Sequence, residues 1–159
     1  MTTDAVTFTV ANECKYTVWP GILTSANVPR NSSSSTGYEL PAGRRAQMTM
    51  AAGWSGRVWG RTGCVFDGSG IGSCVSGDCA GRLSCDGTGA APPTTLAEFA
   101  LQGLGVLQDF YDVSLVDGFN LPLSVAPHNS TCKVASCNAS IDSGCPAELR
   151  VLSPATGAV

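Results

Sequence analysis

The sequence predicts an all-β protein held together by disulfide bonds. Three observations predict this class: short segments in which apolar and polar residues alternate, 19 glycines with 9 prolines among 159 residues, and 8 cysteines. Alternation with a period of two is typical of strands, and glycine and proline mark the turns between them. Internal repeats of roughly 20–50 residues are not evident, so these short strands indicate a β-sandwich or a β-barrel.

The first half of the chain contains the clearest strand patterns. Residues 6–11 alternate between apolar and polar types, and a second run follows at 17–19. After the polar loop 31–37, further strands are expected at 48–50 and 56–61. Alternation continues through the last of these segments, which gives it two distinct faces.

One face of the strand 56–61 is a plausible ligand surface. Alternate residues of a strand point the same way, so Arg57, Trp59 and Arg61 should share this face. Two cationic side chains beside an aromatic ring are suited to a polar ligand.

The next 33 residues are expected to form loops. Residues 63–95 are rich in glycine and cysteine and end near two consecutive prolines, a composition typical of disulfide-pinned turns. The segment 96–101 has good helix propensity, but its short length, the preceding prolines and the all-β context favour a strand. This strand would carry Glu98 on one face.

A turn is expected at Asp117 and Gly118. Residues 110–116 alternate, Asp117 and Gly118 are typical turn residues, and 119–125 resumes as an edge strand because it contains a proline. Asp112 and Asp117 are an odd number of residues apart, so their side chains would point to opposite faces of one flat strand. They can enter one site only if the chain bends or bulges between them.

The cysteines indicate an oxidising compartment. There is no CxxC motif, and His128 is the only histidine, which argues against a zinc site; buried thiols are the alternative. Spacing suggests two local bridges, and the remaining cysteines have no obvious local partner. The suggested bridges are Cys64–Cys74 and Cys79–Cys85, and the cysteines without a local partner are Cys14, Cys132, Cys137 and Cys145.

Charge and hydropathy exclude several function classes. Only 13% of residues are charged, the net charge is −3, and the 9 basic residues are scattered, so nucleic-acid binding is not expected. No apolar run approaches the ~18 residues that span a bilayer. The sequence contains no phosphate-binding or metal-binding motif, and His128 is expected in a loop rather than as a catalytic base.

Secretion is expected from the cysteines, and residues 1–5 are not expected to belong to a signal peptide. Residues 1–5 have neither a basic nor an apolar region. Three N-x-[ST] sequons are candidates for glycosylation in a secretory pathway, at Asn31, Asn129 and Asn138.

Five segments resemble the thaumatin-like proteins, the pathogenesis-related plant defence family that includes osmotin. They occur in the family's order and spacing, and the resemblance covers about residues 5–152. The segments are NECKYTVWP at 12–20, GRVWGRTGC at 56–64, SGDC at 76–79, PPTTLAEF at 92–99 and VDGFNLP at 116–122.

The resemblance implies a flattened two-sheet β-sandwich, an extracellular or vacuolar location and antifungal activity. Several members bind or slowly hydrolyse β-1,3-glucan. It also implies an acidic cleft, whose arginine, glutamate and first two aspartates fall on Arg57, Glu98, Asp112 and Asp117. The third aspartate of that cleft would come from a disulfide-rich second domain, which this chain is expected to lack.

The resemblance also implies a C-terminal truncation. Family pairing supports Cys64–Cys74 and Cys79–Cys85, whereas the four other cysteines would pair with missing segments. We therefore expect a sandwich core at 5–127, the start of the disulfide-rich region at 128–152 and a disordered tail at 153–159. The second domain and the C-terminal strands would be absent.

Two readings of the carboxylates remain open. Glycoside hydrolysis typically needs a protonated and an ionised carboxyl group, and Glu98 with Asp112 or Asp117 could supply them. Glu98 is the better acid because glutamate starts from the higher pKa, while Arg57 could keep an aspartate ionised. Alternatively, the carboxylates are solvated charges or a structural ion pair with Arg57.

Sugar binding makes fewer demands than hydrolysis. Carboxylates accept hydrogen bonds from hydroxyl groups, and Trp59, Phe110 and Tyr111 could pack against sugar rings. The other aromatic residues are expected either in the core or at the surface, depending on whether they lie in a strand-like or a loop-like segment. Core packing is expected for Trp19, Phe99 and Phe119, and solvent exposure for Trp54 and Tyr38.

We expect a defence protein that binds β-1,3-glucan or another cell-wall polysaccharide, without a cofactor. The alternatives are a weak endo-β-1,3-glucanase, an inhibitor of a foreign hydrolase such as a xylanase, and a truncated product without independent activity. The chain should be monomeric unless its free cysteines cross-link two copies.

Overall fold

The computed structural model describes residues 5–26, 28, 35–102, 108–128, 131–139 and 141–153. Two of the three candidate glycosylation sites, Asn31 and Asn129, lie outside these residues, as does the expected tail from residue 154 onward. Asn138 is described and exposed.

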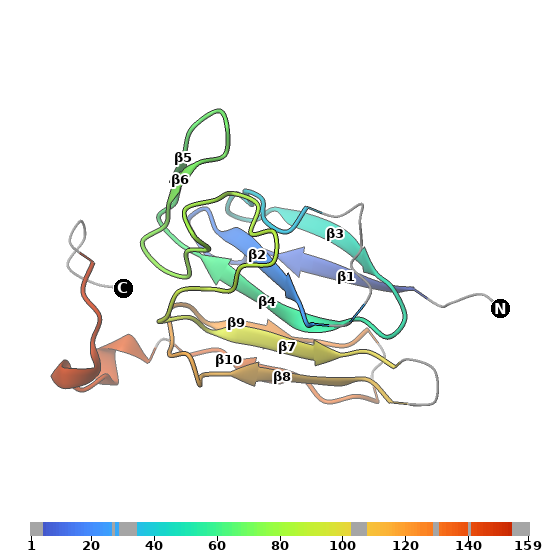
Figure 1. Ribbon diagram of the computed structural model, residues 1–159. Helices are drawn as coiled ribbons and strands as arrows, with labels where there is room; N and C mark the ends of the chain where they lie inside the picture. Colours follow the sequence, from blue (N-terminus) through green and yellow to red (C-terminus); the bar gives the residue numbers. More distant parts are fainter. Residues whose placement is uncertain are drawn as a thin grey trace.

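The described residues form strands and two short 3-10 helices, so the expected all-β class is confirmed (Figure 1). The strands are β1 (Val6–Ala11), β2 (Trp19–Thr24), β3 (Arg45–Met50), β4 (Ser55–Arg61), β5 (Val65–Phe66), β6 (Gly72–Ser73), β7 (Leu96–Ala100), β8 (Phe110–Ser114), β9 (Leu123–Val125) and β10 (Ala135–Cys137). The 3-10 helices are η1 (Asp142–Gly144) and η2 (Ala147–Leu149). No helix among the described residues is long and apolar enough to cross a membrane.

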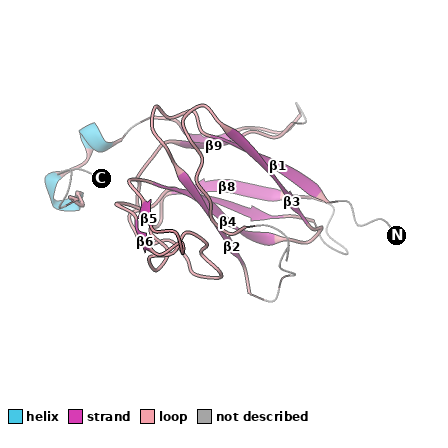
Figure 2. Ribbon diagram, turned by 90° about the horizontal axis from the view of Figure 1, so that it is seen from above, coloured by secondary structure: helices cyan, strands magenta, loops and turns pink. Residues whose placement is uncertain are grey.

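The main sheet contains four antiparallel strands in the order β2-β4-β7-β8. The pairs β1-β3 and β9-β10 lie beside it, and the small hairpin β5-β6 projects from one end (Figures 1 and 2). The edge strand expected at 119–125 begins only at Leu123, directly after Pro122. Proline fits this place because it cannot donate a ladder hydrogen bond.

A hydrophobic core packs β1 and β3 against the four-stranded sheet. Alternation turns Phe8 of β1 inward, where its ring centroid lies 5.9 Å from that of Trp54 and 4.6 Å from that of Phe99. Met48 and Met50 of β3 complete this cluster. The two layers make the fold a β-sandwich, as the family resemblance implies.

Trp54 is therefore a core residue, and the expectation that it faces solvent is wrong. Only 1% of its surface is exposed, and its indole Nε1 donates to Thr24 Oγ1 at 3.0 Å. Tyr38 packs against the same core, and its hydroxyl is buried without a hydrogen-bond partner among the described residues. Burial raises the pKa of Tyr38.

Loops cover most of the face of β4 that was expected to bind a ligand. Trp59 and Arg61 are buried, and the indole of Trp59 donates to the carbonyl oxygen of Gly77 at 2.9 Å. The guanidinium of Arg61 donates to the carbonyl oxygens of Arg82 and Leu83, both at 2.7 Å. The expectation of a three-residue ligand face is therefore wrong, and only the Arg57 end of it remains open.

Arg61 ties the second disulfide loop to the sheet. Besides the loop carbonyls, its guanidinium donates to the carbonyl oxygens of Trp19 at 3.0 Å and Pro20 at 3.2 Å in β2. Burial lowers the pKa of Arg61 to about 10, and the nearby charge of Asp78 opposes this shift. The residue stays charged at neutral pH because this value is well above 7, so it can donate all these bonds at once.

The structure contains the two disulfides that the spacing suggests, Cys64–Cys74 and Cys79–Cys85. The four other cysteines are free. Cys132 is exposed, and Cys14, Cys137 and Cys145 are partly buried.

Candidate functional site

The register of the main sheet aligns three of the four expected cleft residues. Arg57 of β4 lies directly opposite Glu98 of β7, and Glu98 lies directly opposite Asp112 of β8. Directly paired residues point to the same face, with Cβ atoms about 4.5–5.5 Å apart. The sheet thus carries one transverse charged row of Arg57, Glu98 and Asp112.

Asp117 joins this row from a turn. β8 ends at Ser114, and Gly118 N–H donates to the carbonyl oxygen of Leu115 at 3.0 Å, which closes the turn. Gly118 has a φ of +94°, a conformation that side chains with a Cβ rarely adopt. The chain therefore bends between Asp112 and Asp117, as it must if both side chains are to reach one site.

Two hydrogen-bonded contacts fix the turn against the sheet. Thr94 N–H donates to the carbonyl oxygen of Asp117 at 2.9 Å, and the buried side chain of Asn120 accepts from Thr95 N–H at 3.0 Å. Both threonines immediately precede β7. The backbone of Asp117 is therefore held by the segment that leads into the strand carrying Glu98.

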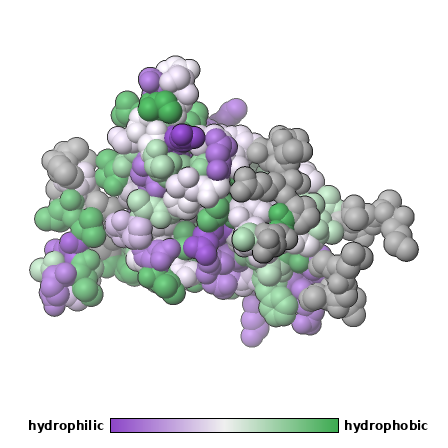
Figure 3. Space-filling view, in the orientation of Figure 1, coloured by the Kyte–Doolittle hydropathy of each residue, from purple (hydrophilic) through white to green (hydrophobic). Residues whose placement is uncertain are grey.

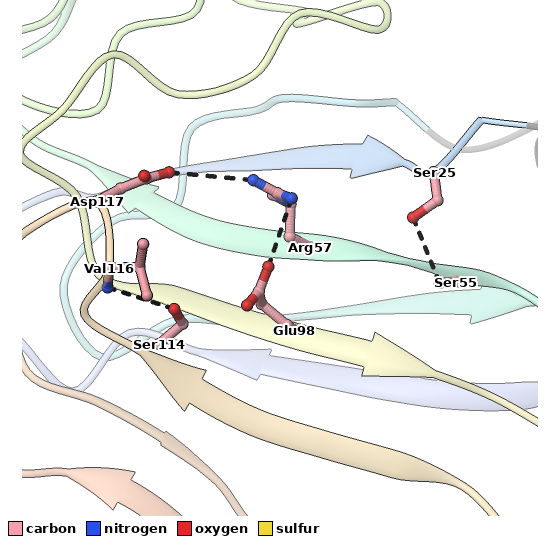
Figure 4. A network of polar contacts seen from close by, with 7 residues as sticks. All are labelled: Ser25, Ser55, Arg57, Glu98, Ser114, Val116 and Asp117. Carbon is pink, nitrogen blue, oxygen red and sulfur yellow. Dashed lines mark hydrogen bonds and ion pairs between the residues drawn. The ribbon is translucent and has the colours of Figure 1, made fainter.

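Arg57 bridges two carboxylates in this site. Its Nη2 lies 3.5 Å from Oε1 of Glu98, and its Nη1 lies 4.0 Å from Oδ2 of Asp117 (Figure 4). About a third or more of each of these three side chains is exposed, so solvent screens the pairs. One arginine faces three carboxylates counting Asp112, which leaves the site with net negative charge.

A hollow of about 220 Å³ lies over the charged row. Its walls include Arg57, Glu98 and Asp112, together with Ser55 and Phe110. The site is thus a concave surface, open to solvent, that combines charged, hydroxyl and apolar groups. No sequence pattern marks Ser55, which is recognised as a site residue only through the strand register.

A larger hollow of about 750 Å³ lies elsewhere, on the outer face of β1 and β3 beside His128. Its lining contains Arg45 but no carboxylate. It therefore lacks the paired acids of the charged row, and we place the candidate site at the smaller hollow. His128 lies in a loop, as expected.

The aromatic residues proposed to contact sugar differ in accessibility. Trp59 is buried, and Tyr111 is partly buried with its hydroxyl donating to the carbonyl oxygen of Lys133 at 2.6 Å. Phe110 is 60% exposed beside the charged row. Trp19 and Phe119 are partly buried, as is Phe99, which packs against the core.

The described residues contain no group of three or more histidine, cysteine, aspartate or glutamate side chains arranged to hold a metal ion. Arg57 and the carboxylates beside it can offer hydrogen bonding, charge pairing and proton transfer.

The thaumatin family model matches residues 12–159. The chain belongs to the thaumatin family. It is 51% identical over 149 residues to a glucan endo-1,3-beta-glucosidase of Prunus avium, a match that covers 92% of this chain and 60% of that protein. It is 49% identical over 150 residues to pathogenesis-related protein 5 of Arabidopsis thaliana, covering 93% of this chain and 60% of that protein.

The thaumatin fold is supported by a solved structure as well. The thaumatin-like xylanase inhibitor TLXI matches with a TM-score of 0.61 and 33% sequence identity, over 82% of this chain and 80% of that chain. This thaumatin-family chain spans about 60% of the length of the sequence relatives named above.

Proposed function

We propose that this thaumatin-family chain is a secreted plant defence protein that binds β-1,3-glucan through Arg57, Glu98, Asp112 and Asp117. The observation that carries the proposal is the convergence of these four residues, from three strands and a turn, on one accessible surface. Relatives named as a glucan endo-1,3-beta-glucosidase and as a pathogenesis-related protein support the ligand and the defence role.

The ion pairing supports sugar binding. The nearest carboxylate oxygens of Glu98 and Asp117 lie 3.5 Å and 4.0 Å from the guanidinium of Arg57, at a surface that solvent reaches. Carboxylates accept hydrogen bonds from sugar hydroxyls, and the guanidinium donates them. Arg57 and Glu98 can therefore hold a sugar hydroxyl between them.

Secretion is supported by the two disulfides, since such bonds persist in oxidising compartments. Antifungal action would follow from attachment to β-1,3-glucan in a fungal wall.

The test is partition onto insoluble β-1,3-glucan, with cellulose as the comparison polymer. We expect Arg57→Gln and Glu98→Gln each to reduce glucan binding. A second ion pair supplies a matched control, because Arg45 and Glu13 are joined at 3.1 Å on an exposed surface. Arg45→Gln and Glu13→Gln change the net charge equally and should leave binding intact. Equal partition of the wild type onto both polymers would overturn the proposal.

A weak endo-β-1,3-glucanase activity is the second candidate, favoured by the name of the Prunus relative. Glu98 with Asp112 would carry it, because the two lie directly opposite each other. Release of reducing sugar from soluble β-1,3-glucan should then disappear in Glu98→Gln. Hydrolysis that persists in this variant would rule out the assigned role of Glu98.

Inhibition of a foreign hydrolase is the third candidate, favoured by the likeness to a xylanase inhibitor. The β5-β6 hairpin projects from the molecule and exposes apolar groups, with Val65 77% and Ile71 53% exposed (Figures 1 and 3). Inhibition that survives Arg57→Gln but is lost in a Val65→Asp variant would place the contact on this hairpin.

A further inference from the structure

A second row of side chains runs across the sheet beside the charged row. Ser55 of β4 lies opposite Ala100 of β7, and Ala100 lies opposite Phe110 of β8. Each is two residues from its counterpart in the charged row, so the two rows share a face and lie about 7 Å apart. We call these three residues the neutral row.

The neutral row belongs to the same hollow as the charged row, because all three of its residues line it. Figure 4 shows Arg57 between Asp117 on one side and the Ser25–Ser55 pair on the other. The Oγ atoms of Ser25 and Ser55 lie 3.3 Å apart. Along the strands, the surface therefore changes from carboxylates to hydroxyls and an aromatic ring.

The exposure of Phe110 follows from its position in β8. The side chains of β8 alternate, so that Phe110 and Asp112 are exposed while Tyr111 and Val113 are partly buried. The residue opposite Phe110 is Ala100, whose methyl group is too small to cover a phenyl ring. The phenyl ring is therefore 60% exposed, and the surface next to it is formed by the small side chain of Ala100.

We propose that the neutral row is a second sugar subsite, which holds the glucosyl unit next to the one at the charged row. This inference rests on the proposed glucan binding. A pyranose ring has an apolar face and a rim of hydroxyl groups, and the Phe110 ring can pack against that face. The hydroxyls of Ser25 and Ser55 can donate to and accept from the rim.

The arrangement also sets the direction of the bound polysaccharide. The two rows succeed each other along the strands, so a chain that fills both must run parallel to β4 and β7. Ala100 forms the floor between Ser55 and Phe110, and a larger side chain there would obstruct this path.

The test measures affinity for β-1,3-linked gluco-oligosaccharides of increasing length by titration calorimetry. We expect wild-type affinity to rise with length until both rows are filled. Phe110→Ala should lower the affinity for the disaccharide and for longer oligosaccharides about three- to tenfold, the loss of one aromatic contact. Glucose, measured in the same way, can occupy the charged row alone and should be little affected. Phe110→Trp should restore the length dependence.

Two further variants separate this effect from unfolding. Ala100→Leu should weaken binding of the disaccharide and of longer oligosaccharides, but not of glucose, because the larger side chain occupies the space between Ser55 and Phe110. Val134→Ala removes an apolar side chain of similar exposure, 58%, that does not line the hollow, and should leave every oligosaccharide affinity unchanged. Circular dichroism establishes that each variant keeps its strands.

The possible results distinguish this inference from the proposed function. If Arg57→Gln abolishes binding but Phe110→Ala has no effect at any length, glucan binding stands and the second subsite is refuted. A wild type that binds none of the oligosaccharides overturns both. Loss of hydrolase inhibition in Phe110→Ala, with unchanged oligosaccharide affinities, would assign the ring to a protein partner and overturn the subsite.

Discussion

Asn120 and Thr95 hold each other by two reciprocal hydrogen bonds in the interior of the protein. Thr95 N–H donates to Oδ1 of Asn120 at 3.0 Å, and Asn120 N–H donates to Oγ1 of Thr95 at 3.3 Å. The pair connects the turn that carries Asp117 to the start of β7, which carries Glu98. The geometry of the charged site therefore depends on a buried amide outside it.

Asn120→Ala should destabilise the protein by about 2–4 kcal/mol. The substitution removes the acceptor of Thr95 N–H and the donor to Gly60 O and Ser76 Oγ, both at 2.9 Å, and buried groups left unpaired are costly. Equilibrium urea unfolding without reductant measures the change. The exposed Asn138 supplies the control, and Asn138→Ala should stay within about 0.5 kcal/mol of wild type. Similar losses in both variants would contradict the assigned role of Asn120.

Gly118→Ala should impair both stability and glucan binding. A Cβ at this position would lie 2.9 Å from Cβ of Pro93, and the φ of +94° is strained for alanine. Relief of the crowding would move the adjacent Asp117 away from Arg57. Gly43 is the matched control, since its φ is +71° but nothing lies within 4 Å of an added Cβ.

The comparison of the two glycine variants separates backbone strain from crowding. Both should lose about 1 kcal/mol from the positive φ, and only Gly118→Ala should lose more and bind glucan less tightly. Thermal unfolding and the glucan partition assay measure the two effects. Unchanged glucan binding in Gly118→Ala would show that the position of Asp117 does not matter for the ligand.

The tip of the β5-β6 hairpin should loosen in acid. The hydroxyl group of Ser69 donates to Asp67 at 2.6 Å, and this bond, with the N–H groups of Ile71 and Ser69, lowers the pKa of Asp67 below its ordinary 3.8. Because the pKa is lower in the folded state, the stabilisation is present above about pH 3.8 and is lost as the pH falls through the folded value.

Carboxyl NMR titration should give a midpoint for Asp67 below 3.8. The amide protons of Ser69 and Ile71 should lose protection from exchange over the same pH range. Asp67→Asn should remove this pH-dependent step. A midpoint at or above 3.8 would be incompatible with the observed hydrogen bonds.

Thiol counting should find four free cysteines per chain. Alkylation of the unfolded, unreduced protein should add four groups, on Cys14, Cys132, Cys137 and Cys145, and reduction should raise the number to eight. Mass spectrometry gives both values directly. Fewer than four adducts without reductant would reveal further bridges, and non-reducing electrophoresis would show whether those bridges join two chains.

The sequence by itself determined several of the strands, the two local disulfides and the family, whereas β5 and β6 lie in the segment 63–95 that was expected to form loops. Alternation and glycine-rich spacing are local signals, so β1, β4 and β8 and the pairs Cys64–Cys74 and Cys79–Cys85 could be anticipated. The ambiguous segment around Glu98 was also predicted correctly as a strand. Motif resemblance supplied Arg57 and the carboxylates as candidates, but not their arrangement.

Only the tertiary structure decided which side chains are accessible and which meet. Trp59 and Arg61 share a strand with Arg57, yet loops distant in sequence bury them and leave Arg57 open. Ser55 joins the site through strand register, and register also places Phe110, already a candidate sugar contact, beside the charged row; no local pattern encodes either position. Burial and pairing depend on residues far apart in the chain, because side chains on different strands become neighbours only when the sheet forms.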